Sequence, residues 1–325
     1  MKINTLINNI KNLYNYINID DIYIELINNE LLLEKYINNA LSTKYSNIKD
    51  SINNLKKTKY IYHIYLNNIN INLYVYSTKK LDTFNYIKLL KVYKRISIIY
   101  KYYNLNKNIN IHLSFWNKPR TFPKNDFFRS KNINGGFTDF LSNDIYIFRK
   151  DEYPKVILHE FIHHIDILNM SIINISTYNK EKIKKFFNIH ENCNFIPVEA
   201  IIEFWCHIYN TIFISIEYNI PFKLLFNKEL NFTLFQYNKI MNNYKFINKW
   251  YEETNVFSYF IIKLILLINY KKFFKLNIPY NENIFVDFIM NNYNYKNYLK
   301  LLKKYNNHFL YLSNNSMNFM LFSNF

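Results

Sequence analysis

The sequence contains very little glycine and cysteine for its 325 residues. Gly occurs only at Gly135 and Gly136, and Cys only at Cys193 and Cys206. Two thiols allow at most one bridge, which excludes a disulfide framework and favours a reducing compartment. The hydrophobic core therefore has to hold the fold, and both thiols are expected to be buried.

Long apolar runs are also absent. The most apolar stretches, 200–222 and 256–268, are interrupted by charged side chains such as Glu203 and Lys263. The second stretch is also shorter than the roughly 20 residues that a bilayer requires. Residues Met1–Asp20 lack the unbroken apolar segment of a secretory signal. The sequence therefore predicts no membrane span, no signal peptide and a cytoplasmic location.

Negative charge is scarce relative to positive charge. Lys and Arg number 41 against 24 Asp and Glu, so the formal net charge is +17. Such a chain can bind nucleic acid, but the charge is almost entirely Lys and forms no dense block. Asn, Ile, Lys, Tyr and Phe are abundant, and their codons are rich in A and T. This codon bias accounts for the excess, so nucleic-acid binding is only a minor alternative.

Apolar residues make up 50% of the sequence, and aromatic residues make up 19%. This content excludes a disordered chain, and at roughly 150 residues per domain the length predicts two domains or two lobes. Apolar periodicity predicts helix at 1–57 and strands at 60–66 and 69–76, which the turn-forming pair Asn67-Asn68 joins into a hairpin. It then predicts a helix to 103, with Asp82 or Thr83 as its cap, strand at 109–116, loop at 117–134 and strand at 144–149. Further helices are expected at 154–168, 181–187, 197–217 and over most of 221–325. The predicted division is 1–57, 58–168 and 169–325.

The two glycines stand together in the segment Asn-Gly-Gly-Phe-Thr. In a chain that otherwise avoids Gly, the pair predicts a backbone need: positive φ, a bulge, or the close approach of another segment. A plain turn is one interpretation. The other is a backbone surface for an extended peptide substrate, with Gly135, Gly136, Phe137 and Thr138 as its residues. Either 135–140 or 144–149 is then expected to be the sheet edge that pairs with such a peptide.

The segment Val156–Asp166 carries the motif His-Glu-x-x-His. His159 and His163 are four residues apart, so a helix presents both imidazoles on one face, as two ligands of a zinc ion. Glu160 is rotated by about 100° from His159, which lets it reach a water at the metal without being a ligand. The alternative is a pair of packed histidines without metal.

A catalytic zinc ion needs a third protein ligand, and residues 197–207 offer one. Glu199 and Glu203 lie one turn apart in an otherwise apolar helical pattern. Two carboxylates there are unfavourable unless a cation or hydrogen-bond donors compensate them. A metal with its histidines would do so, whereas a solvent-exposed stripe on a half-buried helix would need no metal.

At these residues the chain resembles the gluzincin zinc metallopeptidases, in which the H-E-x-x-H helix is followed by a helix with E-x-x-x-D or E-x-x-x-E. The amino-acid sequence of the two motifs is especially similar to that of the lethal-factor group of bacterial toxin peptidases and of related proteins of large DNA viruses. The similarity covers about residues 135–210. It implies that His159, His163 and Glu199 bind zinc, that Glu160 is the general base, and that Glu203 supports a ligand histidine.

One departure from the toxin group concerns the oxyanion. That group has a Tyr shortly before the ligand Glu, whereas no Tyr lies between Tyr178 and Glu199 here. The residue that donates to the oxyanion is therefore not decided, and the candidates are His207, His190 and Tyr178. Asp166, three residues after His163, is expected either to accept a proton from a ligand imidazole or to lie at the surface.

The resemblance implies an α+β, zincin-like fold. It would combine a small twisted sheet lobe, with a backing helix and the motif helix, and a mostly helical C-terminal lobe. We therefore predict a zinc-dependent metallopeptidase with one Zn2+ per chain and a peptide or protein substrate. A viral member would work in the host cytoplasm or the virion. The alternatives are a catalytically inactive zincin-fold binding protein and a basic nucleic-acid-binding protein; the intact Glu160 favours the enzyme.

Overall fold

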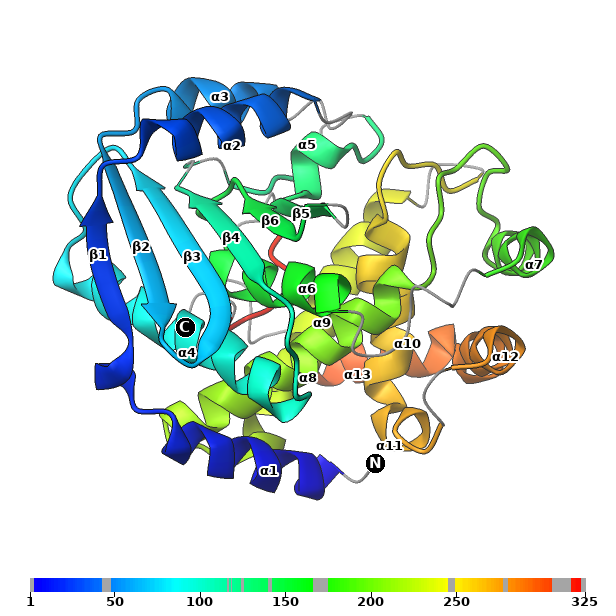
Figure 1. The fold of residues 1–325 in the computed structure, drawn as a ribbon. Coiled ribbons are helices and arrows are strands. Elements are labelled where there is room, and N and C mark those ends of the chain that lie inside the picture. Colours follow the sequence, from blue (N-terminus) through cyan, green and yellow to red (C-terminus); the bar gives the residue numbers. More distant parts are fainter. Residues whose placement is uncertain are drawn as a thin grey trace. The chain divides into compact units, whose positions relative to one another are not determined.

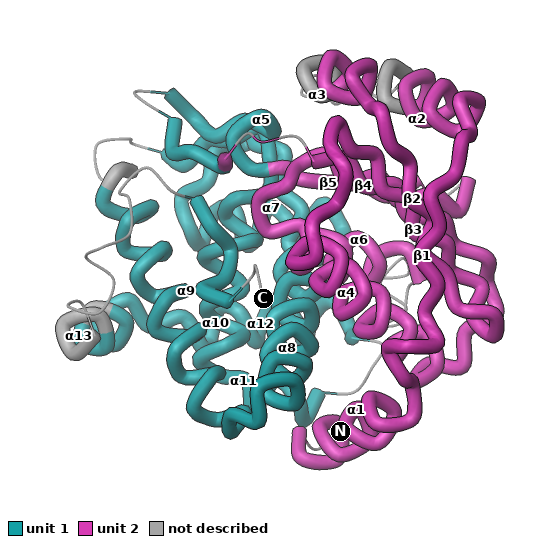
Figure 2. The backbone as a smooth tube through the Cα atoms, turned by 90° about the vertical axis from the view of Figure 1, so that its left-hand side faces the viewer, with its two compact units in different colours: residues 1–2, 120–133, 166–323 teal, residues 3–119, 134–165, 324–325 magenta. Residues whose placement is uncertain are grey.

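A computed structural model describes most of the chain and divides it into two compact units. The described residues are 3–42, 48–115, 117, 119–123, 126–139, 142–165, 175–244, 249–276, 280–305 and 317–322. The sheet unit comprises residues 3–119, 134–165 and 324–325, and the helical unit comprises residues 1–2, 120–133 and 166–323 (Figure 2).

The sheet unit contains a six-stranded mixed sheet with the strand order β1-β2-β3-β4-β6-β5 (Figure 1). Neighbouring strands are parallel in the pairs β3–β4 and β4–β6 and antiparallel in the other three. The strands are β1 (Tyr23–Ile27), β2 (Tyr60–Leu66), β3 (Ile69–Ser77), β4 (Ile109–Ser114), β5 (Gly136–Asp139) and β6 (Asp144–Ile147). The helices of this unit are α1 (Ile3–Tyr16), the 3-10 helix η1 (Ile19–Asp21), α2 (Glu30–Ser42), α3 (Ile48–Leu55), α4 (Thr83–Tyr102) and α6 (Tyr153–Ile165).

Helices cover both faces of this sheet. Because side chains alternate along a strand, Tyr146 and Ile147 of β6 point to opposite faces. Tyr146 belongs to a buried cluster with residues of α2 and α3, among them Tyr36. α6 packs against β5 and β6 on the other face, where an added side chain at Gly136 would meet both Ile147 and Glu160 of α6. α4 contacts β2, β3 and α6.

The helical unit is built around one long buried helix, α8 (Glu199–Glu217). Its residues from Ala200 to Ile214 are all buried, and it contacts α9, η3 and α10. The helices of this unit are α5 (Ser130–Ile133), α7 (Thr177–Phe187), α8 (Glu199–Glu217), α9 (Phe222–Tyr244), the π-helix η3 (Phe257–Ile262), α10 (Lys263–Ile268), α11 (Tyr270–Phe273), α12 (Glu282–Asn292) and α13 (Tyr295–Tyr305).

The predicted mixture of strands and helices is confirmed at the level of class. The structure is a mixed α/β fold with an open six-stranded sheet, consistent with an α+β class. The predicted hairpin is present as β2 and β3, and the helix expected after Asp82 is α4, whose first turn is capped by the Asp82 side chain on the Asn85 amide. The short α5 lies inside the segment expected to be a loop.

The helical prediction for residues 1–57 was wrong in one place. Residues Tyr23–Ile27 form β1, which pairs antiparallel with β2 at the edge of the sheet. Ile24 and Leu26 are two residues apart, but Ile27 breaks this period, and so short a run does not distinguish a strand from a helix. The partner strand β2 supplies the hydrogen bonds that make this segment extended, and it comes more than thirty residues later in the chain.

Candidate metal-ligating helices

The motif helix α6 holds the two predicted histidine ligands on one face. α6 is buried along almost its whole length, and His159 is 6% exposed, whereas His163 is half-buried. Their imidazole rings lie 4.8 Å apart between centroids, in an edge-to-face arrangement. The four-residue spacing therefore brings the two rings together as a helix requires.

Glu160 of the same helix is held by the neighbouring edge strand. The Thr138 hydroxyl of β5 lies 2.9 Å from Oε2 of Glu160 and 3.1 Å from the Glu160 carbonyl oxygen. The Glu160 side chain is almost fully buried, with 9% exposure. The Thr138 hydroxyl therefore ties one carboxylate oxygen of Glu160 to β5.

Gly136 explains how β5 comes so close to α6. An added Cβ would lie 2.7 Å from Cδ1 of Ile147, 2.9 Å from the Tyr146 carbonyl oxygen and 3.1 Å from Cγ of Glu160. Neither glycine has a positive φ, which removes one of the three predicted alternatives. The requirement at Gly136 is the close approach of another segment.

The choice between two possible edge strands is settled by the strand order. β5 lies at the edge of the sheet, whereas β6 is enclosed between β4 and β5. Phe137 of β5 faces away from α6 and stacks on Tyr146, with ring centroids 4.9 Å apart. Of the predicted substrate-binding residues, Gly136 and Thr138 thus face α6 and Phe137 faces the opposite side.

The predicted glutamates begin α8. Glu199 is its first residue and is half-buried, while Glu203 is only 1% exposed. The ammonium group of Lys263, at the start of α10, lies 3.7 Å from Oε2 of Glu203. Sequence reasoning missed Lys263 as the compensating cation, because nothing in the pattern shows which helix faces α8.

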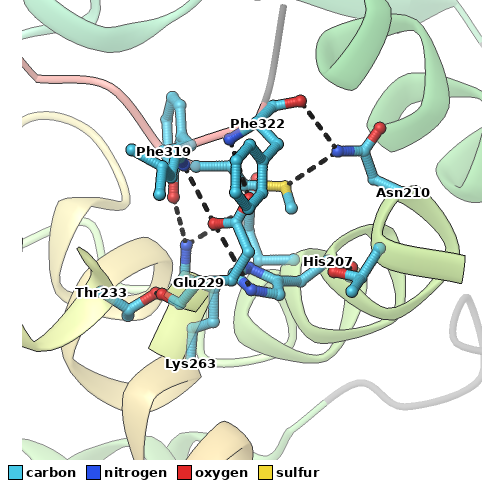
Figure 3. A network of polar contacts seen from close by, with 11 residues as sticks. His207, Asn210, Glu229, Thr233, Lys263, Phe319 and Phe322 are labelled. Atoms are coloured by element: carbon cyan, nitrogen blue, oxygen red, sulfur yellow. Dashed lines mark hydrogen bonds and ion pairs between the residues drawn. The ribbon is translucent and has the colours of Figure 1, made fainter. Parts of the chain in front are cut away.

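His207 lies deeper along α8, in a buried polar network (Figure 3). Its Nε2 is 3.8 Å from Oε2 of Glu229 on α9, and both side chains are fully buried. Glu229 in turn accepts hydrogen bonds from the backbone amides of Leu321 and Phe322. His207 therefore has no exposed surface in this conformation, and its role as an oxyanion donor stays a prediction.

The remaining predicted site residues are spread over loops and helices. Tyr178 is 78% exposed on α7, and Nδ1 of His190 accepts a hydrogen bond from the Asn192 amide. Asp166 lies outside the described residues. His164 of α6 is buried, and burial lowers its pKa below the ordinary value. Cys193 and Cys206 are both buried free thiols, as expected, and burial raises the pKa of Cys193 to about 12.

Comparisons with protein-family models, with curated proteins and with solved structures found no match. Among the helices in the described part of the chain, none has the combination of length and apolar character that crossing a bilayer takes. The side chains of α6, β5 and α8 are therefore the basis for assigning a function.

Proposed function

We propose that the chain is a zinc-dependent peptide hydrolase in which His159, His163 and Glu199 hold the metal. The observation that carries this proposal is the pair of imidazoles on α6, whose ring centroids lie 4.8 Å apart, next to the Glu160 carboxylate that Thr138 holds. Glu199, the first residue of α8, is the third ligand that the sequence predicts.

The chemistry of the donors also fits zinc. Two imidazole nitrogens and one carboxylate oxygen form a donor set typical of catalytic zinc, which keeps its fourth position for water or substrate. A purely structural zinc site would fill all four positions with protein ligands, usually including cysteine. Cys193 and Cys206 are instead both buried free thiols, and they are not close together in the sequence.

Bound zinc would act as a Lewis acid toward the scissile carbonyl and increase the acidity of water at the site. Glu160, one residue from a proposed ligand, would accept the proton of the attacking water and return it to the leaving amine. The open side of β5 would pair with an extended peptide through backbone hydrogen bonds. These assignments require peptide-bond hydrolysis to depend on both the metal and the Glu160 carboxylate.

The metal is tested first, by elemental analysis of the purified chain. We expect one zinc per chain, lost from His163→Ala and retained in His190→Ala, a matched histidine outside the proposed site. Removing zinc with a chelator should abolish hydrolysis of a mixture of unstructured peptides, and added zinc should restore it. A wild-type chain that binds no zinc would refute the proposal.

The general base is tested with Glu160→Gln. This variant should keep its zinc and lose about 10²–10⁴-fold in peptide hydrolysis, the usual contribution of general acid–base catalysis. Full activity in Glu160→Gln would show that another group is the base. Zinc binding without any hydrolysis by the wild type would favour the alternative of an inactive binding protein.

A further inference from the structure

We infer that Thr138 is a positioning residue for Glu160: its hydroxyl holds one carboxylate oxygen and leaves the other for the attacking water. The inference rests on the proposed function, in which Glu160 is the general base. The contact that carries it is the 2.9 Å distance from Thr138 Oγ1 to Glu160 Oε2. The motif itself gives no indication of such a partner.

The Thr138 hydroxyl has two acceptors within reach, and their strengths differ. It lies 3.1 Å from the Glu160 carbonyl oxygen as well as 2.9 Å from the carboxylate. A hydroxyl has a single proton, and an ionised carboxylate is the stronger acceptor. The proton is therefore directed mainly to Oε2, which restrains the carboxylate against rotation.

The same strand also restrains the aliphatic part of the Glu160 side chain. Gly136 and Thr138 are two residues apart on β5, so both face α6. Cγ of Glu160 lies 3.1 Å from the place where a Cβ of Gly136 would be. The Glu160 side chain is thus packed at Cγ over Gly136 and bonded at Oε2 by Thr138.

A restraint of this kind affects catalysis through geometry. A glutamate side chain has three rotatable bonds, and a general base must lie within hydrogen-bond reach of the proton that it removes. A small misplacement of a reacting group can lower the rate about 100-fold. Two residues of one strand, which is itself paired to β6, supply a rigid support for this side chain.

Thr138 has two other possible roles, and kinetics separates them from positioning. A hydroxyl that contacts substrate would change KM when removed. A hydroxyl that only stabilises the fold would change the melting temperature and, through it, the zinc content. A positioning hydroxyl changes kcat while KM, zinc content and melting temperature stay near their wild-type values.

The test uses the zinc-loaded chain with Thr138→Val, which keeps the shape but removes the donor, and Thr138→Ser, which keeps the donor. Thr83→Val, at the exposed start of α4, is the matched control. We expect Thr138→Val to lower kcat about 10- to 100-fold, with KM within twofold. Thr138→Ser and Thr83→Val should remain within about threefold of wild type.

A second readout does not depend on activity. Crystal structures of the wild type and Thr138→Ser should show Glu160 in one conformer, and that of Thr138→Val should show it in several. A single unchanged conformer in Thr138→Val, an undiminished kcat, or an equal loss in Thr138→Ser would overturn the inference. A wild type that binds zinc but hydrolyses nothing would refute the proposed function, while the conformers of Glu160 would still test the contact.

Discussion

The two units hold their buried acidic side chains in different ways. In the helical unit, Glu203 and Glu229 depend on groups of other helices and of the segment 317–322. In the sheet unit, Glu160 and Asp144 are held by residues at fixed positions of neighbouring strands, supplemented for Asp144 by Lys35 of α2. A substitution in the helical unit therefore affects contacts that join several helices and the segment 317–322, whereas one in the sheet unit affects mainly contacts with the adjacent strand or helix.

The segment 317–322 shows this mutual dependence in the helical unit. It has no regular structure, and buried side chains of three helices bind its backbone (Figure 3). Glu229 accepts from the amides of Leu321 and Phe322 at 2.9 and 2.8 Å, and Lys263 donates to the Phe319 carbonyl at 3.2 Å. Buried polar groups are costly without partners, so these helices and this segment stabilise one another.

The largest effect is expected from Lys263→Met in the helical unit. The ammonium group is fully buried beside Glu203, and removing one partner of a buried ion pair costs about 3–5 kcal/mol. Urea unfolding of Lys263→Met and of the wild type measures the difference in the free energy of unfolding. Adding Glu203→Met should recover most of the loss, because an apolar pair needs no compensating charge. A loss below about 1 kcal/mol would show that this pair behaves like an exposed one.

The fold was predictable where the sequence pattern is local. The Asn67-Asn68 turn gave the β2–β3 hairpin, and Asp82 marked the start of α4, because both signals act within a few residues. β1 was missed because its extended conformation depends on pairing with β2. Lys263 was missed for the same reason: its contact with Glu203 joins α10 to α8, and no spacing within either helix indicates it.

A smaller effect is expected from Gly136→Ala in the sheet unit. The new Cβ would meet Cδ1 of Ile147 at 2.7 Å and the backbone oxygen of Tyr146 at 2.9 Å. Such overpacking costs typically about 1–3 kcal/mol. Gly136→Ala combined with Ile147→Val should recover only part of the loss, because the backbone oxygen cannot withdraw like a side chain. Equal stability of Gly136→Ala and wild type in urea would contradict the close approach of β5 to α6.

The candidate site was predictable in its residue types and less so in its supports. The spacing of His159 and His163 follows from helix geometry, so one segment of sequence is enough to place both rings on the same face. The hydroxyl of Thr138 acts on Glu160 across 22 positions of sequence. Its role depends on the pairing of β5 with β6, which decides the face to which Thr138 points.

The smallest effect is expected from Asp144→Asn, and it should depend on pH. Burial alone raises the pKa of Asp144, but donors from His112, Asn110 and Lys35 together hold it below its ordinary range. Lys35 is half exposed, so solvent weakens its interaction with the Asp144 carboxylate. We therefore expect Asp144→Asn to lower the free energy of unfolding by about 1 kcal/mol at pH 7, the usual contribution of a hydrogen bond.

The sign of this pH dependence follows from the lowered pKa of Asp144 in the folded chain. The contribution of its carboxylate is complete above the unfolded pKa of about 3.9 and disappears as the pH falls toward the folded pKa. Urea unfolding at pH 7 and pH 3 should therefore show a smaller difference between Asp144→Asn and wild type at pH 3. Asp82→Asn is the control, because Asn caps a helix about as well as Asp. A difference that grows at low pH would mean that the charge of Asp144 destabilises the sheet unit, and the contrast with the helical unit would then fail.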